Sequence, residues 1–484
     1  MPNTKARPPI VTILGHVDHG KTTLLDYIRK TKLTAKEHGG ITQAIGAYEI
    51  STNLKGYPTD KITFIDTPGH EAFSQLRARG ANVADIALLI VDAKDSVRPQ
   101  TIESISHITA AKIPFIVVLN KIDLPEANPE KVKVDLTKNG VLVEGKGGNV
   151  PTINISAKTG KGVDELLETI LLLSSELNLK YEPQTSFQGF VLEAKKDKRG
   201  VTAGVVLKDG GLKIGDTVFA GNIKGRVKAM INDVGGNIKE VAPSTPFELL
   251  GFESLPEVGT AVTSVEQVVQ PKAPETSPQE GLTMEAFLKP EEGKKISLLI
   301  KADSQGSLEA INNSLIKNEN IEILHESVGE ITKADIFLAK TGKAIVIGFN
   351  ANPSKEIDDL AKQEKVVIKT YNIIYELIDE LTEVSSLLKE KEEQEKNVKA
   401  EAKILATFII HDEKVFGIKV TKGKVNLGDS IEVYRDDKMA GKAKLISLKI
   451  RAKTVQEVKK DQEAGIIFSP QLDIKVGDVV KFIL

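Results

Sequence analysis

The stretch Ile13–Arg29, "ILGHVDHGKTTLLDYIR", decides the fold of the first part of the chain. It has the spacing G-x-x-x-x-G-K-T, between the apolar run "IVTIL" and the helical pattern "TLLDYIR". A loop with so little side-chain bulk exposes its backbone N–H groups at a helix N-terminus, where an anion is stabilised. The stretch therefore predicts a phosphate-binding loop that takes a nucleoside triphosphate.

Each part of this loop has an expected role. Its backbone would hold the α- and β-phosphates, Lys21 would reach the β/γ oxygens, and Thr22 would bind Mg²⁺. The alternative is a glycine-rich turn that binds nothing, and the flanking strand and helix patterns count against it. The residues assigned to the nucleotide here are Gly15, His16, Val17, Asp18, His19, Gly20, Lys21, Thr22 and Thr23.

A second motif, "NKID", follows the apolar run "FIVVL" and predicts which base is bound. The Asp123 carboxylate can accept hydrogen bonds from the N1–H and the exocyclic amine of guanine, a pattern that adenine does not offer. "SAK" follows the next apolar run and is expected to close over the same ring, with the Lys121 stem on the other side. Alone, "NKID" would more often be a turn at a strand end. The residues assigned to the base are Asn120, Lys121, Asp123, Ser156, Ala157 and Lys158.

Between these motifs lies "DTPGH", at the end of the run "ITFI". Asp66 is expected to support Mg²⁺ through water, and the Gly69 N–H to bond the γ-phosphate. Loss of that phosphate would release the segment, which makes an order–disorder switch. His70 is the candidate for orienting the attacking water. The alternative for a lone histidine is a surface residue.

Composition limits the class of protein. The 484 residues predict roughly three or four domains. With 40% hydrophobic and 27% charged residues and no apolar run of about 18 residues, no membrane span is predicted. The start of the sequence has no secretory pattern, so a cytoplasmic location is expected. The absence of cysteine excludes disulfides, thiolate zinc sites and cysteine nucleophiles.

The pattern of apolar runs predicts a multidomain α/β plus β architecture. Apolar runs alternate with helical patterns in the first part, which is typical of a parallel α/β domain, and short strands broken by Gly and Asp follow, as in small barrels. The predicted parts are a tail (1–8), a P-loop GTPase domain (9–181), a β-barrel (182–269), a linker (270–281), a small α/β/α domain (282–372), a long connecting helix (373–402) and a C-terminal β-barrel (403–484).

The two barrel regions share a repeat. "GVVLKDGGLKIGD", from Gly204 to Asp216, aligns without gaps to "GIKVTKGKVNLGD", from Gly417 to Asp429. Gly-Asp turns are common in any β-rich domain, but the strand alternation matches as well. The repeat predicts two barrels of one type, which flank the second α/β domain in the sequence.

The motifs "GHVDHGKT", "DTPGHEAF" and "NKID" resemble those of translational GTPases, and "GGITQAIGAY" and "IKADSQGSLEAI" are similar to the bacterial initiation factor two family. The resemblance covers nearly the whole chain. It implies GTP and GDP as ligands with Mg²⁺, Thr42 as a further contributor to the metal site, and His70 as the catalytic histidine. The metal-site residues are then Thr22, Thr42 and Asp66.

The resemblance also implies partners. GTP would favour a conformation that engages the small ribosomal subunit, carries initiator formylmethionyl-tRNA on the last barrel and promotes joining of the large subunit. Ribosomal RNA and other initiation factors are further expected partners, and the protein is expected to be a monomer. Lys449, Arg451 and Glu463 are the expected tRNA contacts, while Ile418 and Ala464 stand where the family has cysteines. The alternative for the three contacts is a basic barrel rim.

Two other functions remain open at this level. One is an aminoacyl-tRNA carrier similar to elongation factor Tu, although its three-domain plan lacks both "IKADSQGSLEAI" and the long helix. The other is a ribosome-associated scaffold that binds GTP without needing to hydrolyse it. Substitution of His70 separates the scaffold from the enzyme, and competition between initiator and elongator tRNAs separates the carrier from the initiation factor.

Overall fold

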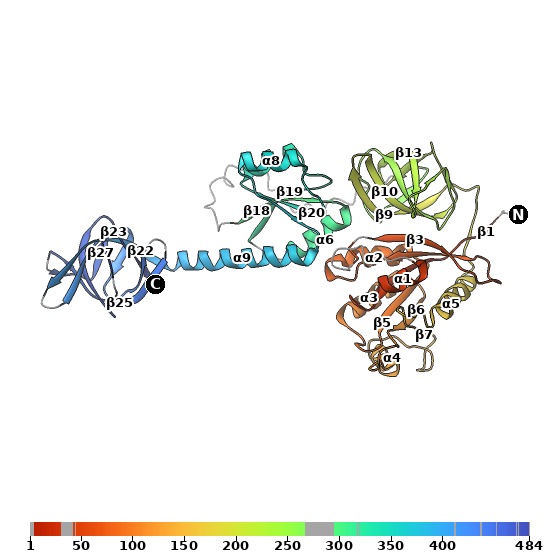
Figure 1. Cartoon of the computed structure of the whole chain (residues 1–484), viewed down its shortest axis with the longest axis horizontal. Coiled ribbons are helices and arrows are strands. Elements are labelled where there is room, and N and C mark those ends of the chain that lie inside the picture. Colours follow the sequence, from red (N-terminus) through yellow and green to blue (C-terminus); the bar gives the residue numbers. More distant parts are fainter. Residues whose placement is uncertain are drawn as a thin grey trace. The chain divides into compact units, whose positions relative to one another are not determined.

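The strand β2 (Ile10–Gly15) runs through the centre of a six-stranded sheet with the order β3-β4-β2-β5-β6-β7. The other strands are β3 (Gly46–Ser51), β4 (Lys61–Asp66), β5 (Ile86–Asp92), β6 (Phe115–Asn120) and β7 (Thr152–Asn154). The helices are α1 (Lys21–Arg29), α2 (Ser74–Val83), α3 (Pro99–Ala111), α4 (Pro129–Lys138) and α5 (Val163–Glu176). Residues of α1 and α5 pack on one face of the sheet, and residues of α2, α3 and α4 on the other (Figure 1).

This computed structural model describes residues 4–30, 42–43, 45–266, 295–316, 318, 320–410, 413–435, 438–451, 453–470, 472 and 474–483. The predicted linker 270–281 lies outside these residues. The chain divides into two compact units, one with the described residues up to Leu381 and one with those from Thr382. In the described parts, no helix is both long and apolar enough to cross a membrane.

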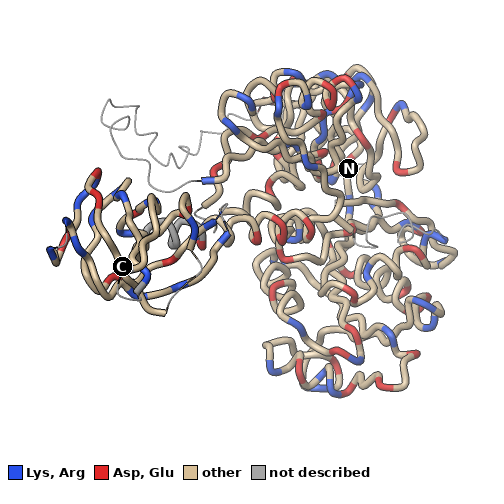
Figure 2. The backbone as a smooth tube through the Cα atoms, turned by 60° about the vertical axis from the view of Figure 1, so that its left-hand side comes forward, with Lys and Arg blue, Asp and Glu red and all other residues tan. Residues whose placement is uncertain are grey.

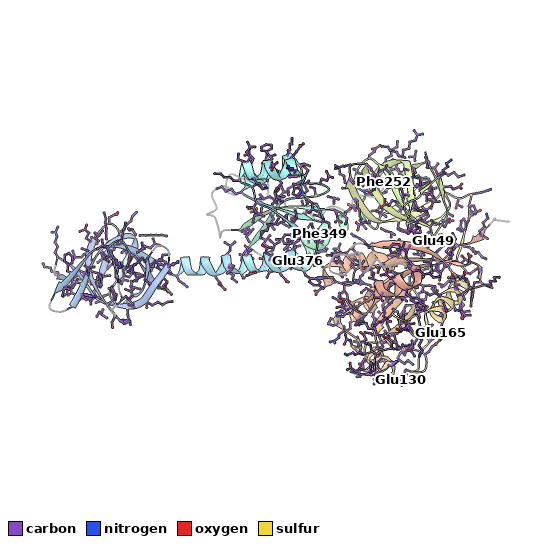
Figure 3. The ribbon with its side chains drawn as sticks, in the orientation of Figure 1. Glu49, Glu130, Glu165, Phe252, Phe349 and Glu376 are labelled. Atoms are coloured by element: carbon purple, nitrogen blue, oxygen red, sulfur yellow. The ribbon has the colours of Figure 1, made fainter. Side chains whose placement is uncertain are left out.

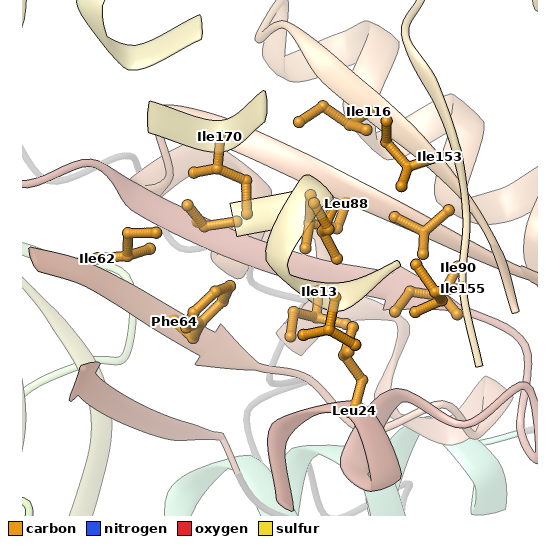
Figure 4. Packing of buried hydrophobic residues seen from close by; sticks show 14 of the residues in the cluster. Ile13, Leu24, Ile62, Phe64, Leu88, Ile90, Ile116, Ile153, Ile155 and Ile170 are labelled. Carbon is orange, nitrogen blue, oxygen red and sulfur yellow. The ribbon is translucent and has the colours of Figure 1, made fainter. Parts of the chain in front are cut away.

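The core of the first domain explains the apolar runs of its sequence. Strand residues such as Ile13, Leu88 and Ile90 are fully buried, and Leu24 of α1 and Ile170 of α5 pack against them (Figure 4). Because both faces of these strands are covered, apolar residues occupy successive positions and do not alternate with polar ones. The carboxyl ends of β2, β4, β5 and β6 thereby bring the predicted site motifs to one edge of the sheet.

The sheet differs from the predicted parallel sheet at one edge. β3 pairs antiparallel with β4, and its half-buried residues carry no continuous apolar pattern. Glu49 of β3 (Figure 3) accepts hydrogen bonds from Lys61 Nζ at 2.6 Å and from Thr245 Oγ1 at 3.0 Å. The edge strand is thus tied to the barrel that follows.

The N-terminal residues also differ from the predicted free tail. β1 (Lys5–Ala6) pairs antiparallel with β8 (Lys180–Tyr181), and Arg7 is buried beside Asp85. The pairing joins positions far apart in the sequence, so no local sequence pattern predicts it. Residues 5–8 belong structurally to the domain predicted to begin at residue 9.

Both barrels are closed by six strands. In the first, β12-β17-β9-β10-β16-β13 closes by pairing of β13 with β12, and in the last, β22-β29-β24-β25-β28-β23 closes by pairing of β23 with β22. The first barrel comprises β9 (Gln188–Asp197), β10 (Gly200–Asp209), β12 (Thr217–Ala220), β13 (Ile223–Asn232), β16 (Pro246–Phe252) and β17 (Ala261–Thr263), with the short β11 (Leu212–Lys213), β14 (Asn237–Ile238) and β15 (Glu240–Val241). The last comprises β22 (Val398–Ile410), β23 (Glu413–Asn426), β24 (Ser430–Arg435), β25 (Lys438–Ile450), β28 (Glu463–Ser469) and β29 (Val479–Ile483), with the short β26 (Lys453–Thr454) and β27 (Glu457–Lys459).

The sequence repeat corresponds to one local structure in both barrels. Asp216 Oδ2 accepts from the N–H of Lys213 at 2.8 Å, and Asp429 Oδ2 accepts from the N–H of Asn426 at 2.8 Å. The glycine before each aspartate has a positive φ, +97° and +92°, a conformation that favours glycine. The two Gly-Asp turns are therefore equivalent, as the alignment predicts.

The second α/β domain is a four-stranded parallel sheet with the order β19-β18-β20-β21. Its elements are β18 (Ile296–Ala302), α6 (Gln305–Leu315), β19 (Ile321–Val328), α7 (Lys333–Gly342), β20 (Ile345–Phe349), α8 (Lys355–Glu364) and β21 (Ile368–Tyr371). Phe349 (Figure 3) is fully buried in it.

The long helix α9 (Ile374–Lys396) follows. Its first turns are anchored by Ile374, Leu377 and Leu381, which are buried. The helix ends at Lys396, within the predicted helix/linker segment 373–402, because Val398 and the residues after it pair with β29 and β23. The last barrel thus begins about five residues earlier than predicted, since the charged residues there suit an exposed strand as well as a helix.

Candidate functional site

The phosphate-binding loop lies between β2 and α1 and requires its glycines. Gly15 has φ +145°, and a Cβ there would lie 2.4 Å from the Ile90 carbonyl oxygen. Gly20 has φ +89°, and its Cβ would lie 2.4 Å from Asn120 Nδ2. Asp18 also has a positive φ, of +63°. These turns bring the loop backbone to the N-terminus of α1, where N–H groups that lack an intrahelical partner are available to an anion.

Lys21 reaches back over this loop. Its Nζ donates to the carbonyl oxygens of Gly15, at 3.0 Å, and His16, at 2.7 Å. Burial lowers the pKa of Lys21 to about 8, although the carboxylate of Asp66 opposes this change. A Cβ at Gly69 would lie 2.5 Å from Lys21 Nζ, so the glycine of "DTPGH" is what allows the lysine to lie against that segment.

The P-loop, "NKID" and "SAK" are held together by one side chain. Asn120 Nδ2 donates to the His19 carbonyl oxygen at 2.8 Å, and Asn120 Oδ1 accepts from the N–H groups of Lys121 at 2.7 Å and Ala157 at 2.9 Å. Only 1% of Asn120 is exposed. The residue therefore joins the three segments from within.

Two adjoining cavities lie along these loops. The first, of about 270 Å³, is bordered by the P-loop, the "DTPGH" segment and Thr42, and the second, of about 240 Å³, is bordered by "NKID" and "SAK". Gly20, Thr23 and Lys121 border both cavities, so the two lie next to each other, and together they are called the groove. The first cavity is lined by Val17, Asp18, Gly20, Lys21, Thr22, Thr23, Thr42, Gly69, His70, Lys121 and Tyr375. The second is lined by Gly20, Thr23, Asn120, Lys121, Asp123, Leu124, Ala157 and Lys158.

The base end of the groove has an ionised carboxylate. A hydrogen bond from Ser156 holds the pKa of Asp123 below its usual value, and the Lys158 and Lys121 cations act in the same direction. Lys121 has a positive φ of +61°, and its Nζ lies 2.7 Å from Asp92 Oδ2. The ammonium is thus held by β5 while the aliphatic stem remains along the groove.

Three oxygen-bearing side chains from separate segments meet at the other end. The Thr22 and Thr42 hydroxyls share a hydrogen bond of 2.7 Å, and Thr42 Oγ1 donates to Asp66 Oδ2 at 3.4 Å. Hydroxyl and carboxylate oxygens are the ligands that Mg²⁺ prefers. The three predicted metal-site residues therefore lie together, in an arrangement whose chemistry fits this ion.

His70 borders the first cavity and is held from several sides. Its Nδ1 accepts from the N–H of Ala72 at 2.8 Å, and its ring centroid lies 4.0 Å from that of Tyr375. Burial, together with the Arg77 cation, lowers the pKa of His70, whereas Glu71 opposes this. The imidazole is therefore neutral at physiological pH, with the remaining proton on Nε2 because Nδ1 is an acceptor.

Arg77 is a residue that the sequence did not single out. It is fully buried, and its guanidinium donates to the carbonyl oxygens of Pro68, at 2.9 Å, and His70. It also makes a two-point ion pair with Glu103, at 2.7 and 2.8 Å. Burial alone would raise the pKa of Glu103, but hydrogen bonds from His107, Ser74 and Arg77 lower it to about 2. Arg77 thus fixes the "DTPGH" backbone. The sequence gives no signal for this role beyond the presence of an arginine in the helix that follows the motif.

The segment "DSQGSLEAI" joins the second α/β domain to its neighbours. The N–H of Gly306 donates to Glu193 Oε1 of the first barrel at 3.2 Å, and Glu309 forms an ion pair of 2.7 Å with Arg79 of α2. A Cβ at Gly306 would lie 3.0 Å from Leu76 of α2. The glycine and glutamate of this motif are therefore placed to connect α6 with the helix that follows "DTPGH".

The expected tRNA contacts lie on the outside of the last barrel. Lys449 on β25 pairs with Gly465 on β28, two residues from Glu463, and Arg451 follows β25 directly. All three are exposed, and basic and acidic residues are interspersed over this barrel (Figure 2). Ile418 and Ala464, by contrast, are cross-strand partners buried in the barrel core, so their side chains do not shape that surface.

Comparison with known proteins agrees with the order of these domains. Residues 7–175 match the family model described as elongation factor Tu GTP binding domain, and residues 186–265 match elongation factor G domain 2. Residues 273–382 match translation-initiation factor 2. A crystal structure of GDP-bound aIF5B from Aeropyrum pernix has 26% identity and a TM-score of 0.47, and covers 99% of this chain and 92% of that chain.

Curated relatives match over nearly the whole chain. Translation initiation factor IF-2 of Bartonella tribocorum is 44% identical over 503 residues, which is 99% of this chain and 59% of the relative. The same factor of Thermoanaerobacter sp. is 43% identical over 98% of this chain and 71% of the relative. The chain spans under two thirds of the length of the Bartonella relatives that it matches. Because this chain is 43% identical to the Thermoanaerobacter factor and covers 71% of it, it belongs to the translation initiation factor IF-2 family.

Proposed function

We propose that this protein is a GTPase of translation initiation. It binds GTP and GDP with Mg²⁺, brings initiator formylmethionyl-tRNA to the small ribosomal subunit, promotes subunit joining, and hydrolyses GTP when the ribosome stimulates it. The observation that carries the proposal is the pair of adjoining cavities, one lined by Lys21 and Gly69 and the other by Asp123, in a chain that belongs to this family.

The phosphates would lie against the P-loop and Lys21. In binding them, the lysine exchanges the carbonyl oxygens of Gly15 and His16 for phosphate oxygens. The N-terminus of α1 contributes its unpaired N–H groups. Because the Gly69 backbone lies against Lys21, its N–H can report on the third phosphate, and only GTP would then hold the "DTPGH" segment.

Thr22, Thr42 and Asp66 would hold Mg²⁺. When bound, this ion neutralises charge that develops on the phosphate oxygens. Thr22 is the second residue of α1 and Asp66 ends β4, so both are fixed by secondary structure. Thr42 lies beside them, so its position would depend on whether the site is occupied.

His70 would orient the attacking water by donating a hydrogen bond. Its Nδ1 already accepts from Ala72, so the neutral ring carries a donor at Nε2. In this tautomer the side chain positions the water, and does not remove its proton. The burial that lowers the pKa of His70 keeps a second positive charge away from Lys21.

The last barrel would carry the acceptor end of the initiator tRNA, with Lys449 and Arg451 near its phosphates and Glu463 beside them. Salt-dependent phosphate contacts are the expected source of affinity. The remaining proposed partners are ribosomal RNA, both ribosomal subunits and other initiation factors. With these partners the protein would act in the cytoplasm. We propose that it acts as a monomer.

Calorimetry with GTP, GDP and ATP tests the nucleotide site. We expect both guanine nucleotides to bind in the presence of Mg²⁺ and ATP not to. Asp123→Asn should lose affinity for GTP and gain affinity for xanthosine triphosphate, because xanthine has a carbonyl oxygen where guanine has an amine. Absence of GTP and GDP binding by the unmodified protein would falsify the proposal.

Hydrolysis is tested with ribosomes. His70→Ala should lower the ribosome-stimulated rate on the order of 10²-fold or more while the affinity for GTP is kept. An unchanged rate would favour the GTP-binding scaffold. Competition between formylated initiator tRNA and elongator aminoacyl-tRNA should favour the initiator, and a preference for the elongator would favour the carrier.

A further inference from the structure

Tyr375, in the first turn of α9, packs against the predicted catalytic histidine. The ring centroids of Tyr375 and His70 are 4.0 Å apart with an interplanar angle of 51°. The Nε2 of His70 has no solvent-accessible surface and no hydrogen-bond partner among the described residues. A nitrogen with no accessible surface cannot contact a water molecule or a phosphate. The proton donor of the proposed mechanism is therefore covered in this arrangement.

The same turn of α9 is held by the segment that carries Thr42. Gln43 Nε2 donates to the carbonyl oxygen of Asn372 at 2.7 Å, and Gln43 Oε1 accepts from the N–H of Ile374 at 3.0 Å. The second bond satisfies a backbone donor at the start of the helix, which otherwise has no intrahelical partner. A side chain adjacent to the metal site thus acts as an external cap on α9.

Packing of the helix does not require the tyrosine. Ile374 and Leu377 are fully buried and anchor the first turns of α9, whereas 40% of Tyr375 is exposed. Tyr375 faces the phosphate cavity with Val17 and Asp18. Its ring therefore lies over the site and outside the core of its own domain.

We propose that Tyr375 is a positioning residue that holds His70 in a covered, idle arrangement, and that Gln43 keeps the first turn of α9 in place over it. Movement of this turn would uncover Nε2. The inference rests on the proposed GTPase function, and it adds a restraint on hydrolysis that is built into the chain itself.

Single-turnover hydrolysis of GTP without ribosomes tests this restraint. Tyr375→Ala should raise the rate about fivefold or more, as removal of the cover shifts the population to the uncovered state. Tyr375→Phe keeps the ring and should raise the rate less than Tyr375→Ala does. Leu387→Ala removes a half-exposed apolar side chain further along α9 and serves as the matched control, with no change expected.

A double variant assigns the effect to His70. Tyr375→Ala combined with His70→Ala should lose the whole gain in rate. A gain that persists in the double variant overturns the proposal, as does an unchanged or lower rate in Tyr375→Ala alone. A lower rate would mean that the tyrosine orients the imidazole productively. Affinity for a fluorescent GDP derivative should stay within about twofold in every variant, so that a failed restraint is distinguished from a failed nucleotide site.

Gln43→Ala provides a second route that leaves Tyr375 intact. Loss of both hydrogen bonds should loosen the turn and raise the ribosome-free rate, by less than Tyr375→Ala. The NMR signal of the His70 imidazole supplies a readout that does not depend on activity. It should move in Tyr375→Ala, where the neighbouring ring is removed, and remain in place in Tyr375→Phe. An unmoved signal in Tyr375→Ala contradicts the contact.

Discussion

Arg7 and Asp85 form a two-point ion pair in which both side chains are buried. The two Nη–Oδ distances are 2.6 and 2.7 Å, and the side chains are 8% and 7% exposed. Asp85 Oδ2 also accepts from the N–H of Ile10 at 2.9 Å, and Arg7 Nη1 donates to Ser244 Oγ of the first barrel at 3.4 Å. The pair joins the start of the chain to the first domain and the barrel.

Removal of the arginine should be strongly destabilising. Arg7→Ala leaves Asp85 buried without its main partner, which typically costs about 3–5 kcal/mol. Arg199→Ala, which breaks an exposed arginine–aspartate pair, should cost less than about 1 kcal/mol. Urea unfolding followed by circular dichroism at pH 7 measures both. Equal losses in the free energy of unfolding would mean that burial of the Arg7–Asp85 pair adds nothing to the cost of breaking it.

The cost of Arg7→Ala should shrink in acid. Burial alone would raise the pKa of Asp85, but the hydrogen bonds and charge of Arg7 outweigh it and hold the pKa below its usual value. A carboxyl with a lowered pKa stabilises the fold above its ordinary pKa and loses this contribution as the pH falls through the folded value. The stability gap between parent and variant should thus be constant near neutral pH and narrow below about pH 4. A gap that persists to pH 3 would contradict this assignment.

Gly20→Ala should weaken nucleotide binding. The new Cβ combines a left-handed φ of +89° with a contact of 2.4 Å to Asn120 Nδ2, so both the loop and the asparagine must shift. We expect a loss in GDP affinity of about tenfold or more by calorimetry. Gly56 has φ +100° but open space around its Cβ position. Gly56→Ala is therefore the control for backbone strain alone, and an equal loss in that variant would refute the explanation.

Glu193→Gln should change how stability depends on pH. Burial raises the pKa of Glu193, although Lys195 and the N–H groups of Gly306 and Ala194 oppose it. A group with a raised pKa stabilises the fold below its ordinary pKa and loses this contribution as the pH rises through the folded value. The unmodified protein should therefore lose stability relative to the variant as the pH rises above the ordinary glutamate pKa of about 4.3. Thermal unfolding across this range measures it, with the exposed Glu240 as the control position.

Lys449→Ala and Arg451→Ala should weaken binding of initiator tRNA through lost phosphate contacts. Each should reduce the slope of log affinity against log salt concentration by about 1. Lys213→Ala removes an exposed lysine of the first barrel and should leave the slope unchanged. Filter binding at several salt concentrations measures the slopes. Unchanged slopes for both variants would mean that Lys449 and Arg451 belong to a basic barrel rim that makes no phosphate contacts with the tRNA.

The fold was predictable where its determinants are local. The apolar runs that became β2, β4, β5 and β6 are covered on both faces, and burial on both faces leaves a continuous pattern in the sequence. The Gly-Asp turn of Asp216 and Asp429 was predictable for the same reason, because its hydrogen bond spans three residues. The cradle around Lys21 followed from a motif in which spacing alone determines the backbone path.

Contacts between distant segments had no such signal. Gln43 and Ile374 are 331 positions apart, and neither residue type indicates a partner, since a glutamine can bond any exposed backbone group. The antiparallel edge strand β3 was missed because its residues are half-buried and lack a distinctive period. The covering of His70 by Tyr375 likewise depends on where packing places α9, which no local pattern fixes.

The three hydrogen bonds of Asn120 fix the spacing between the loops that border the groove. One end of the amide is attached to the P-loop and the other to the "SAK" segment, so in the proposed nucleotide site a single planar group sets the distance between the loop for the phosphates and the loops for the base. A shift at one end of that site would therefore be transmitted to the other end.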